Sequence, residues 1–237
     1  MQFRGCTCSL HPILETPETF ALVTEYGYDV FFTVTALCVV IGLGAYLFID
    51  QAIVRTTLVA AAILLFIFTL NFFRDPERTV PPGEENVVSP ADGTVIKIER
   101  VTEERFMKGE ALMICVFMSP VNVHVNRHPV SGVIRHFEHI PGEFFAAWED
   151  KASLKNEQTH IGIENERGKV FFKQIAGFIA RRIVAPVAVG DTAERGKRFG
   201  MIKFGSRVDI YVPVTAEVKV RLNEKTTAGE TVVAVLR

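Results

Sequence analysis

The chain has almost no net charge and few cysteines. Its 26 lysines and arginines nearly balance 27 aspartates and glutamates, which leaves a net charge of −1. A chain without a strong field of one sign is a poor match for nucleic acid, so we expect no nucleic-acid partner. The four cysteines are Cys6, Cys8, Cys38 and Cys115. Their spacing indicates neither a disulfide framework nor a zinc knuckle, which favours a reducing compartment.

Two long apolar runs lie in the N-terminal third of the sequence. Residues 30–48 carry no charge, and residues 52–73 carry only Arg55. Each run is long enough to cross a hydrocarbon core of about 30 Å as a helix, and the short connection predicts a hairpin. Arg74 and Arg78 follow the second run and favour the cytoplasmic side of the cell (inner) membrane for both ends. A pair of buried core helices is the alternative.

The composition changes sharply after the second run. The next residues are rich in proline and charge, as in a linker. Short alternating segments separated by Gly, Pro and Asn/Asp then predict β-strands, and Phe144 to Lys155 is the best candidate for a helix or an ordered loop. We predict a mostly β (α+β) soluble domain preceded by a two-helix transmembrane hairpin. The expected divisions are a tail (1–29), the hairpin (30–73), a linker (74–86) and the soluble domain (87–237).

A glycine–serine pair stands between two apolar stretches near the C-terminus. Residues 200–213 read GMIKFGSRVDIYVP, with Gly205-Ser206 at the centre. On its own this pair is an ordinary two-residue hairpin turn. Ser206 is nevertheless a candidate nucleophile, because a hydroxyl beside a glycine carbonyl has room to attack it.

Histidines and one aspartate supply candidate proton carriers. His124 and His128 lie in VNVHVNRHPVSG, whose first residues, 121–125, are predicted as a strand. Histidine exchanges protons near neutral pH, although a satisfied structural histidine is the ordinary interpretation. Asp92 precedes a glycine, which by itself indicates a plain turn. A metal site is a further option because His136 and His139 lie close together in the sequence, but no recognised ligand motif is present, and we expect no metal.

Five segments follow one another along the chain in a recognisable order: FFRDPER, SPADGTV at Ser89–Val95, MSPVNVHVNRHPVSG at Met118–Gly132, IPGEFF at Ile140–Phe145, and GMIKFGSRVD. Together they resemble the short form of the phosphatidylserine decarboxylase family. The resemblance runs from about Phe72 to the C-terminus, roughly two-thirds of the chain. Longer family members carry Leu-Gly-Ser-Thr where this chain has Phe204-Gly205-Ser206-Arg207, a departure that matches the short form.

The resemblance implies a self-processed, pyruvoyl-dependent carboxy-lyase. The bond between Gly205 and Ser206 would break, and Ser206 would become a covalent pyruvoyl group (pyruvate). That group would form a Schiff base with phosphatidylserine and accept electrons as CO2 leaves, giving phosphatidylethanolamine. The cleaved chains would form an α/β heterodimer, compatible with a homodimer of such pairs. The resemblance implies no metal and no diffusible cofactor.

Roles for three further residues also come from the resemblance. Asp92 would be the acid of an Asp-His-Ser arrangement that drives self-cleavage, orienting the histidine and stabilising its cation. His124 and His128 stand beside the paired histidines of the longer enzymes, where the spacing is one residue shorter.

Substrate contacts are expected at an aromatic cluster and an arginine pair. Phe144 and Phe145 follow a Pro-Gly turn and suit a lipid interface, although core packing fits them equally well. Arg181 and Arg182 have the charge to neutralise a head-group phosphate, or they are solvated.

Two other functions remain open at the level of sequence. A different serine-headed lipid, such as an archaeal ether lipid, would need the same head-group chemistry. A non-catalytic membrane-tethered β scaffold would keep the chain in one piece, whereas the enzyme would be cut into residues 1–205 and 206–237.

Overall fold

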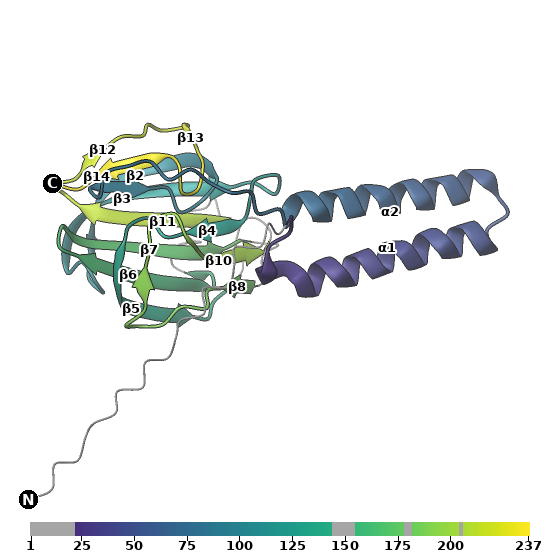
Figure 1. Ribbon diagram of the computed structural model, residues 1–237, viewed down its shortest axis with the longest axis horizontal. Helices are drawn as coiled ribbons and strands as arrows, with labels where there is room; N and C mark the ends of the chain where they lie inside the picture. Colours follow the sequence, from purple (N-terminus) through teal and green to yellow (C-terminus); the bar gives the residue numbers. More distant parts are fainter. Residues whose placement is uncertain (1–21, 144–154, 178–181, 204–205) are drawn as a thin grey trace, which may run out of the picture.

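The computed structural model of the chain describes residues 22–143, 155–177, 182–203 and 206–237. A β domain carries a helical hairpin that projects from one end (Figure 1). This architecture confirms the predicted fold class. The helical elements are η1 (Glu25–Gly27), α1 (Tyr28–Phe48) and α2 (Ala52–Phe72).

The hairpin has the length and composition of two membrane spans. Both helical segments reach a mean hydropathy of 2.3, and only 11 % of each apolar window is buried against the rest of the chain. Large apolar side chains such as Phe48, Ile53 and Leu64 are exposed along the two helices. Exposed apolar surface of this extent fits membrane association.

The β domain is built from three antiparallel sheets. An eight-stranded sheet has the order β13-β2-β3-β11-β7-β6-β5-β9, and two three-stranded sheets have the orders β4-β10-β8 and β1-β14-β12. The strands are β1 (Asn86–Val88), β2 (Gly93–Glu103), β3 (Gly109–Met118), β4 (Val125–Arg127), β5 (Gly132–Ile140), β6 (Gln158–Asn165), β7 (Gly168–Ala176), β8 (Arg182–Val184), β9 (Thr192–Ala193), β10 (Arg198–Lys203), β11 (Ser206–Pro213), β12 (Glu217–Val218), β13 (Lys225–Thr226) and β14 (Val232–Val235).

The large sheet has two different faces. Alternate residues of β11 illustrate this, because side chains along a strand point to opposite sides. Val208, Ile210 and Val212 join the main apolar core between the sheets. Tyr211 belongs to a smaller apolar cluster on the other face. These two sides are called the inner face and the outer face below, and Ser206 is in phase with the inner-face residues of β11.

The described strands on either side of residues 204–205, β10 and β11, belong to different sheets, so they do not pair as a hairpin. One local expectation from the sequence is wrong. Residues 121–125 do not form one strand, since β4 begins only at Val125. Before it the chain turns, with the Asn122 side chain accepting hydrogen bonds from the amide and the hydroxyl of Ser119. Asparagine favours such turns because its side chain competes for backbone donors.

The hairpin is joined to the β domain by an apolar contact. Phe72 and Phe73 are completely buried with Met201 of β10, in a cluster that also includes Val23. Where the chain enters and leaves the hairpin, the Thr24 amide donates to the Phe73 carbonyl at 2.9 Å. The end of α2 is therefore part of the folded domain.

Ion pairs attach the segment that follows α2 to the same domain. Asp75 contacts Arg127 at 3.1 Å and Arg198 at 2.6 Å. Arg78 contacts Asp92 at 2.9 Å. Residues 74–86 thus run across the domain surface and are held at several points.

Candidate active site

Ser206 is the first residue of β11 and is completely buried. Its neighbours across the sheet are Met118 in β3 and Ala176 in β7. The Ser206 hydroxyl donates to the Met118 Sδ at 3.3 Å. Because a thioether is a weak acceptor, this contact holds the hydroxyl only lightly and leaves its oxygen lone pairs available.

His124 presents a basic nitrogen inside the protein. Its Nδ1 lies 3.0 Å from the Asn122 carbonyl oxygen, and a carbonyl can only accept, so the proton is on Nδ1. The remaining Nε2 is buried without a hydrogen-bond partner among the described residues. Burial, with a smaller contribution from the charge of Arg74, lowers the pKa of His124 to about 4. The imidazole is therefore a neutral base at physiological pH.

The His124 ring is covered by the end of the membrane hairpin. Phe72, the last residue of α2, stacks on it with ring centroids 4.1 Å apart and an interplanar angle of 29°. Arg74 follows closely and donates to the Val121 carbonyl at 3.1 Å. Sequence reasoning assigned Phe72 no role, since its only local signal was its position at the end of an apolar run.

The fold brings His124 and Ser206 into the same region. The amide of Ile202 in β10 lies 3.4 Å from the His124 carbonyl. Ser206 follows Ile202 by four residues, so at most about 14 Å of extended chain separates them. In addition, the Asn126 amide lies 3.8 Å from the Met118 sulfur that Ser206 also contacts.

His128 occupies the opposite end of β4. Its amide donates to the Lys197 carbonyl at 2.8 Å, and its ring lies 5.0 Å from that of Phe199. Burial lowers the pKa of His128 to about 4. These contacts place it beside the start of β10, whereas Ser206 follows the end of that strand. His124 is therefore attached near the end of β10, and His128 near its start.

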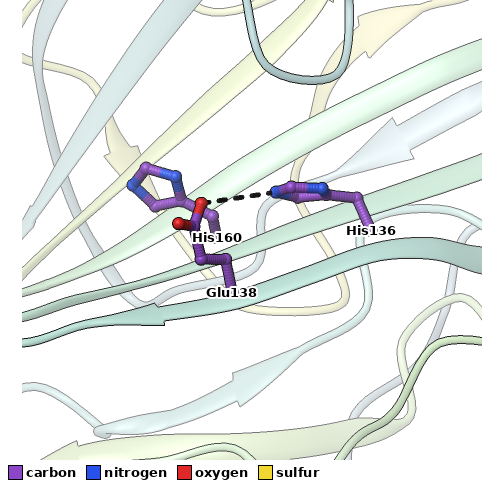
Figure 2. Close-up of side chains that lie close together, drawn as sticks. All are labelled: His136, Glu138 and His160. Atoms are coloured by element: carbon purple, nitrogen blue, oxygen red, sulfur yellow. Dashed lines mark ion pairs between the residues drawn. The ribbon is translucent and has the colours of Figure 1, made fainter.

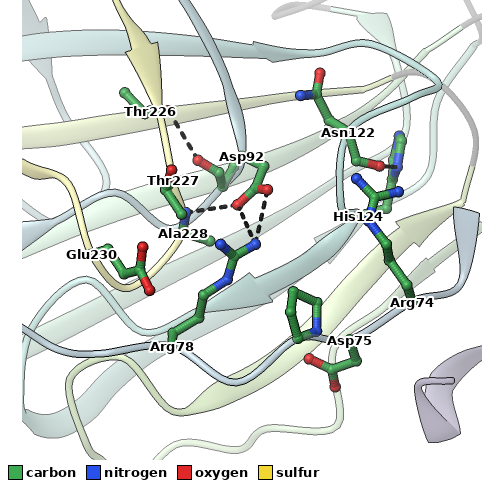
Figure 3. Close-up of polar contacts among 12 residues, drawn as sticks. Arg74, Asp75, Arg78, Asp92, Asn122, His124, Thr226, Thr227, Ala228 and Glu230 are labelled. Atoms are coloured by element: carbon green, nitrogen blue, oxygen red, sulfur yellow. Dashed lines mark hydrogen bonds and ion pairs between the residues drawn. The ribbon is translucent and has the colours of Figure 1, made fainter. Parts of the chain in front are cut away.

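Asp92 is held by an arginine and a backbone amide. Arg78 donates to both of its oxygens, at 3.1 and 2.9 Å, and the Ala228 amide donates to Oδ1 at 2.8 Å. Figure 3 shows this group, and beside it a second one in which His124 lies with Asn122 and Arg74. No hydrogen bond or ion pair joins Asp92 to His124 or His128 in the part of the chain that the structure describes. The expected Asp-His contact is thus not formed in this state.

Some expected site residues lie outside the described residues, namely Gly205, Phe144, Phe145 and Arg181. Arg182 is described, and its largely exposed side chain pairs with Asp29 at 3.5 Å. Lys203 contacts the same carboxylate at 2.9 Å. Two basic groups therefore gather at the start of α1, and one of them, Lys203, is three residues before Ser206 in the chain.

Comparisons with known proteins show the family to which the chain belongs. The family model described as phosphatidylserine decarboxylase matches residues 65–234. The chain belongs to the phosphatidylserine decarboxylase family. A relative from Chlorobium luteolum, named phosphatidylserine decarboxylase proenzyme, is 46 % identical over 90 % of this chain and 99 % of its own length. Relatives with the same name from Chlorobium phaeobacteroides and Cytophaga hutchinsonii are 41 % and 40 % identical, covering 89 % and 90 % of this chain and 98 % and 97 % of their own lengths.

The family match connects segments that are far apart in the sequence. The FFRDPER segment provides Phe72, Asp75 and Arg78, which contact His124, Arg127 and Asp92 respectively. Asp92 lies in the second family segment, and His124 and Arg127 lie in the third. The segments that resemble the phosphatidylserine decarboxylase family therefore converge on one region of the fold.

Proposed function

We propose that this protein decarboxylates phosphatidylserine to phosphatidylethanolamine after cutting itself between Gly205 and Ser206. One observation carries the proposal. A fully buried serine hydroxyl begins the central strand of the sheet, and a neutral imidazole with an unpartnered Nε2 lies in the same region. The word proenzyme in the names of the relatives agrees with self-processing.

Self-cleavage uses the chain's own atoms. The Ser206 oxygen attacks the Gly205 carbonyl carbon, and the C–N bond breaks as an ester forms, with the hydroxyl proton passing to the departing amine. Loss of the Ser206 Cα proton then expels the Gly205 carboxylate and leaves a dehydroalanine. Water converts the dehydroalanine into a ketone and ammonia. The products are residues 1–205 and a pyruvoyl-capped chain that starts at position 206.

His124 is the base that we assign to the removal of a proton from Ser206. Its Nδ1 is fixed by the Asn122 carbonyl, so Nε2 carries the free lone pair. Its lowered pKa keeps it unprotonated at neutral pH. Asp92 and His128 were expected beside it from the resemblance, and their contacts support structural roles instead.

The surroundings of Ser206 fit a pyruvoyl group. Position 206 is buried at the start of β11, and its two cross-strand neighbours, Met118 and Ala176, are apolar. The Nε2 of His124 lies in the same region and makes no hydrogen bond within the described residues. When present, a pyruvoyl group supplies a ketone that captures a primary amine and withdraws electrons during loss of CO2. His124 lies in the same region, and we assign to it the return of a proton to the product.

The two cleaved chains would stay together through the large sheet. After cleavage β11 belongs to the small chain, yet it pairs with β3 over residues 206–213 and with β7 over residues 206–211. Strands β12, β13 and β14 of the small chain pair with one another or with β1 and β2. An α/β heterodimer follows from this interleaving.

The hairpin would place the site at the bilayer that contains the substrate. Phe72 ends α2 and covers His124, so the reacting region lies next to the base of the hairpin. We propose that the hairpin spans the cell (inner) membrane with the β domain on the cytoplasmic face. Arg182 and Lys203 pair with Asp29 at the start of α1 and suit a lipid phosphate.

Intact mass spectrometry of protein purified from membranes tests the proposal. We expect two chains, residues 1–205 and 206–237, and release of CO2 from carboxyl-labelled phosphatidylserine in nanodiscs. Ser206→Ala should leave one full-length chain and no CO2 release, whereas the matched control Ser131→Ala should behave like the wild type. A full-length chain as the sole species in active membranes would contradict the proposal and favour a scaffold. A wild type that is cut but releases CO2 only from another serine-headed lipid would correct the substrate.

A further inference from the structure

A second cluster of titratable side chains lies on the outer face of the large sheet, away from Ser206. It consists of His136 and Glu138 in β5 and His160 in β6 (Figure 2). His136 and Glu138 are two residues apart and so point to the same side of their strand. Glu138 is paired directly with His160 across the two strands. His160 also packs on Phe171 of the outer apolar cluster at 5.5 Å, edge to face.

The three side chains are close enough to share one ion. One ligand atom from each lies within 4.8 Å of the others, and the His136 Nε2 is 3.9 Å from the Glu138 Oε2. Ligand atoms bound about 2 Å from a zinc ion lie at most about 4 Å apart. Small side-chain rotations would therefore complete the set.

Two ring nitrogens in the cluster make no hydrogen bond within the described part of the chain. They are the Nδ1 of His160 and the Nε2 of His136, both buried, and His160 is only 2 % exposed. The other nitrogen of His160, Nε2, lies 2.9 Å from the Gln158 Oε1. Because an amide oxygen only accepts, this contact puts the proton on Nε2 and leaves the Nδ1 lone pair directed at the cluster. An outer hydrogen bond of this kind is what metal-bound histidines make.

Burial keeps His160 unprotonated. It is the main cause that lowers the pKa of His160 to about 3, and the charges of Lys173 and Arg105 contribute to the same shift. A histidine must be neutral to bind a metal, so the imidazole is ready to act as a ligand. The same two cations oppose a divalent ion, and Arg105 contacts the Glu138 Oε2 directly.

We propose that His136, Glu138 and His160 bind one divalent transition-metal ion, with zinc as the ion that the ligands fit best. Two imidazoles and one carboxylate are a ligand set that zinc accepts, with a fourth position left for water. The ion would join β5 to β6 on the outer face. It would take no part in the reaction at Ser206, which is in phase with the inner-face residues of β11.

Zinc binding to the full-length protein in nanodiscs tests this proposal. The protein should carry no polyhistidine tag and should have Cys6→Ser and Cys8→Ser, because those thiols are also zinc ligands. After chelator treatment and dialysis, we expect about one zinc ion per chain by competition with a chromophoric chelator. His160→Ala, His136→Ala and Glu138→Gln should each weaken binding at least about tenfold.

Two further variants separate a metal site from general damage. His139 is on the same strand, but it faces away from the cluster and pairs with Glu157 at 3.0 Å, so His139→Ala should bind zinc like the parent. Arg105→Ala should bind more tightly, because it removes a cation from the Glu138 carboxylate. If His160→Ala fails to fold, the comparison uses His136→Ala and Glu138→Gln, because these two side chains are partly exposed and their replacement disturbs packing less. Equal zinc binding by the parent and the cluster variants, including no binding by any of them, would overturn the proposal.

Discussion

Replacing Phe72 with alanine is expected to move the acid limit of self-cleavage toward neutral pH. In the intact protein, Phe72 stacks on His124, and burial lowers the pKa of that histidine to about 4. Removal of the ring admits water to the imidazole and lets its pKa return toward the ordinary value of 6.5. If the return is complete, about one tenth of His124 remains neutral near pH 5.5, compared with nearly all of it in the wild type.

The expected result is thus a loss of about tenfold in cleavage rate near pH 5.5, relative to the rate of the same variant near pH 8. Using this ratio removes the general cost of truncating a buried phenylalanine, which is about 3–5 kcal/mol. The rate is measured by synthesising the chain in vitro into nanodiscs and following the uncut chain by mass spectrometry at each pH. Phe66→Ala is the matched control, because Phe66 is on the same helix and contacts Phe31. A Phe72→Ala profile that stays parallel to that of the wild type, or an equal shift in the control, would refute the assignment of His124 as the base.

Three other outcomes follow from the same contacts. His128→Ala should lower Tm, because its ring packs on Phe199, while the pH profile of cleavage stays unchanged; a shifted profile would place His128 in the reaction. Asp92→Asn should cost about 1–3 kcal/mol of unfolding free energy by weakening the contact with Arg78, and urea titration of Asp92→Asn, Arg78→Gln and the double variant should show less than additive losses. Acid should destabilise the wild type between pH 6.5 and about 4, because unfolded His124 binds a proton that the folded form, with its lower pKa, does not. That histidine alone removes about 2 kcal/mol at pH 5, and a urea midpoint that rises from pH 7 to pH 5 would contradict this sign.

Local sequence patterns account for most of the secondary structure. The apolar runs 30–48 and 52–73 coincide closely with α1 and α2, because hydropathy over about twenty residues is a local property. The alternation in residues 208–212 likewise identified β11. The strand expected over residues 121–125 failed for an equally local reason, since the Asn122 side chain forms a turn with Ser119. The asparagine indicated this turn, but the alternating valines around it indicated a strand, and the strand was predicted.

Residues of the candidate site could be predicted only where they lie within a recognisable sequence motif. Gly205-Ser206 was found because several family segments occur in order. The partners of Asp92 could not be found this way, because its contact with Arg78 depends on how residues 74–86 cross the domain. The metal cluster was missed for a similar reason. His160 is separated from His136 by a whole strand connection, and only the pairing of β5 with β6 brings them together.

The FFRDPER segment joins the helical hairpin to the candidate active site through buried contacts. A simple tether would tolerate a loose connection, yet Phe72 is completely buried against the domain and Asp75 is nearly so. Asp75 sits between Arg127 and Arg198, at 3.1 and 2.6 Å. A carboxylate buried this deeply is costly unless it is paired, so the segment holds its position only while both arginines are in place. Because Arg127 follows His124 by three residues and Arg198 begins β10, the same contacts that fix the hairpin also fix the strand leading to Ser206.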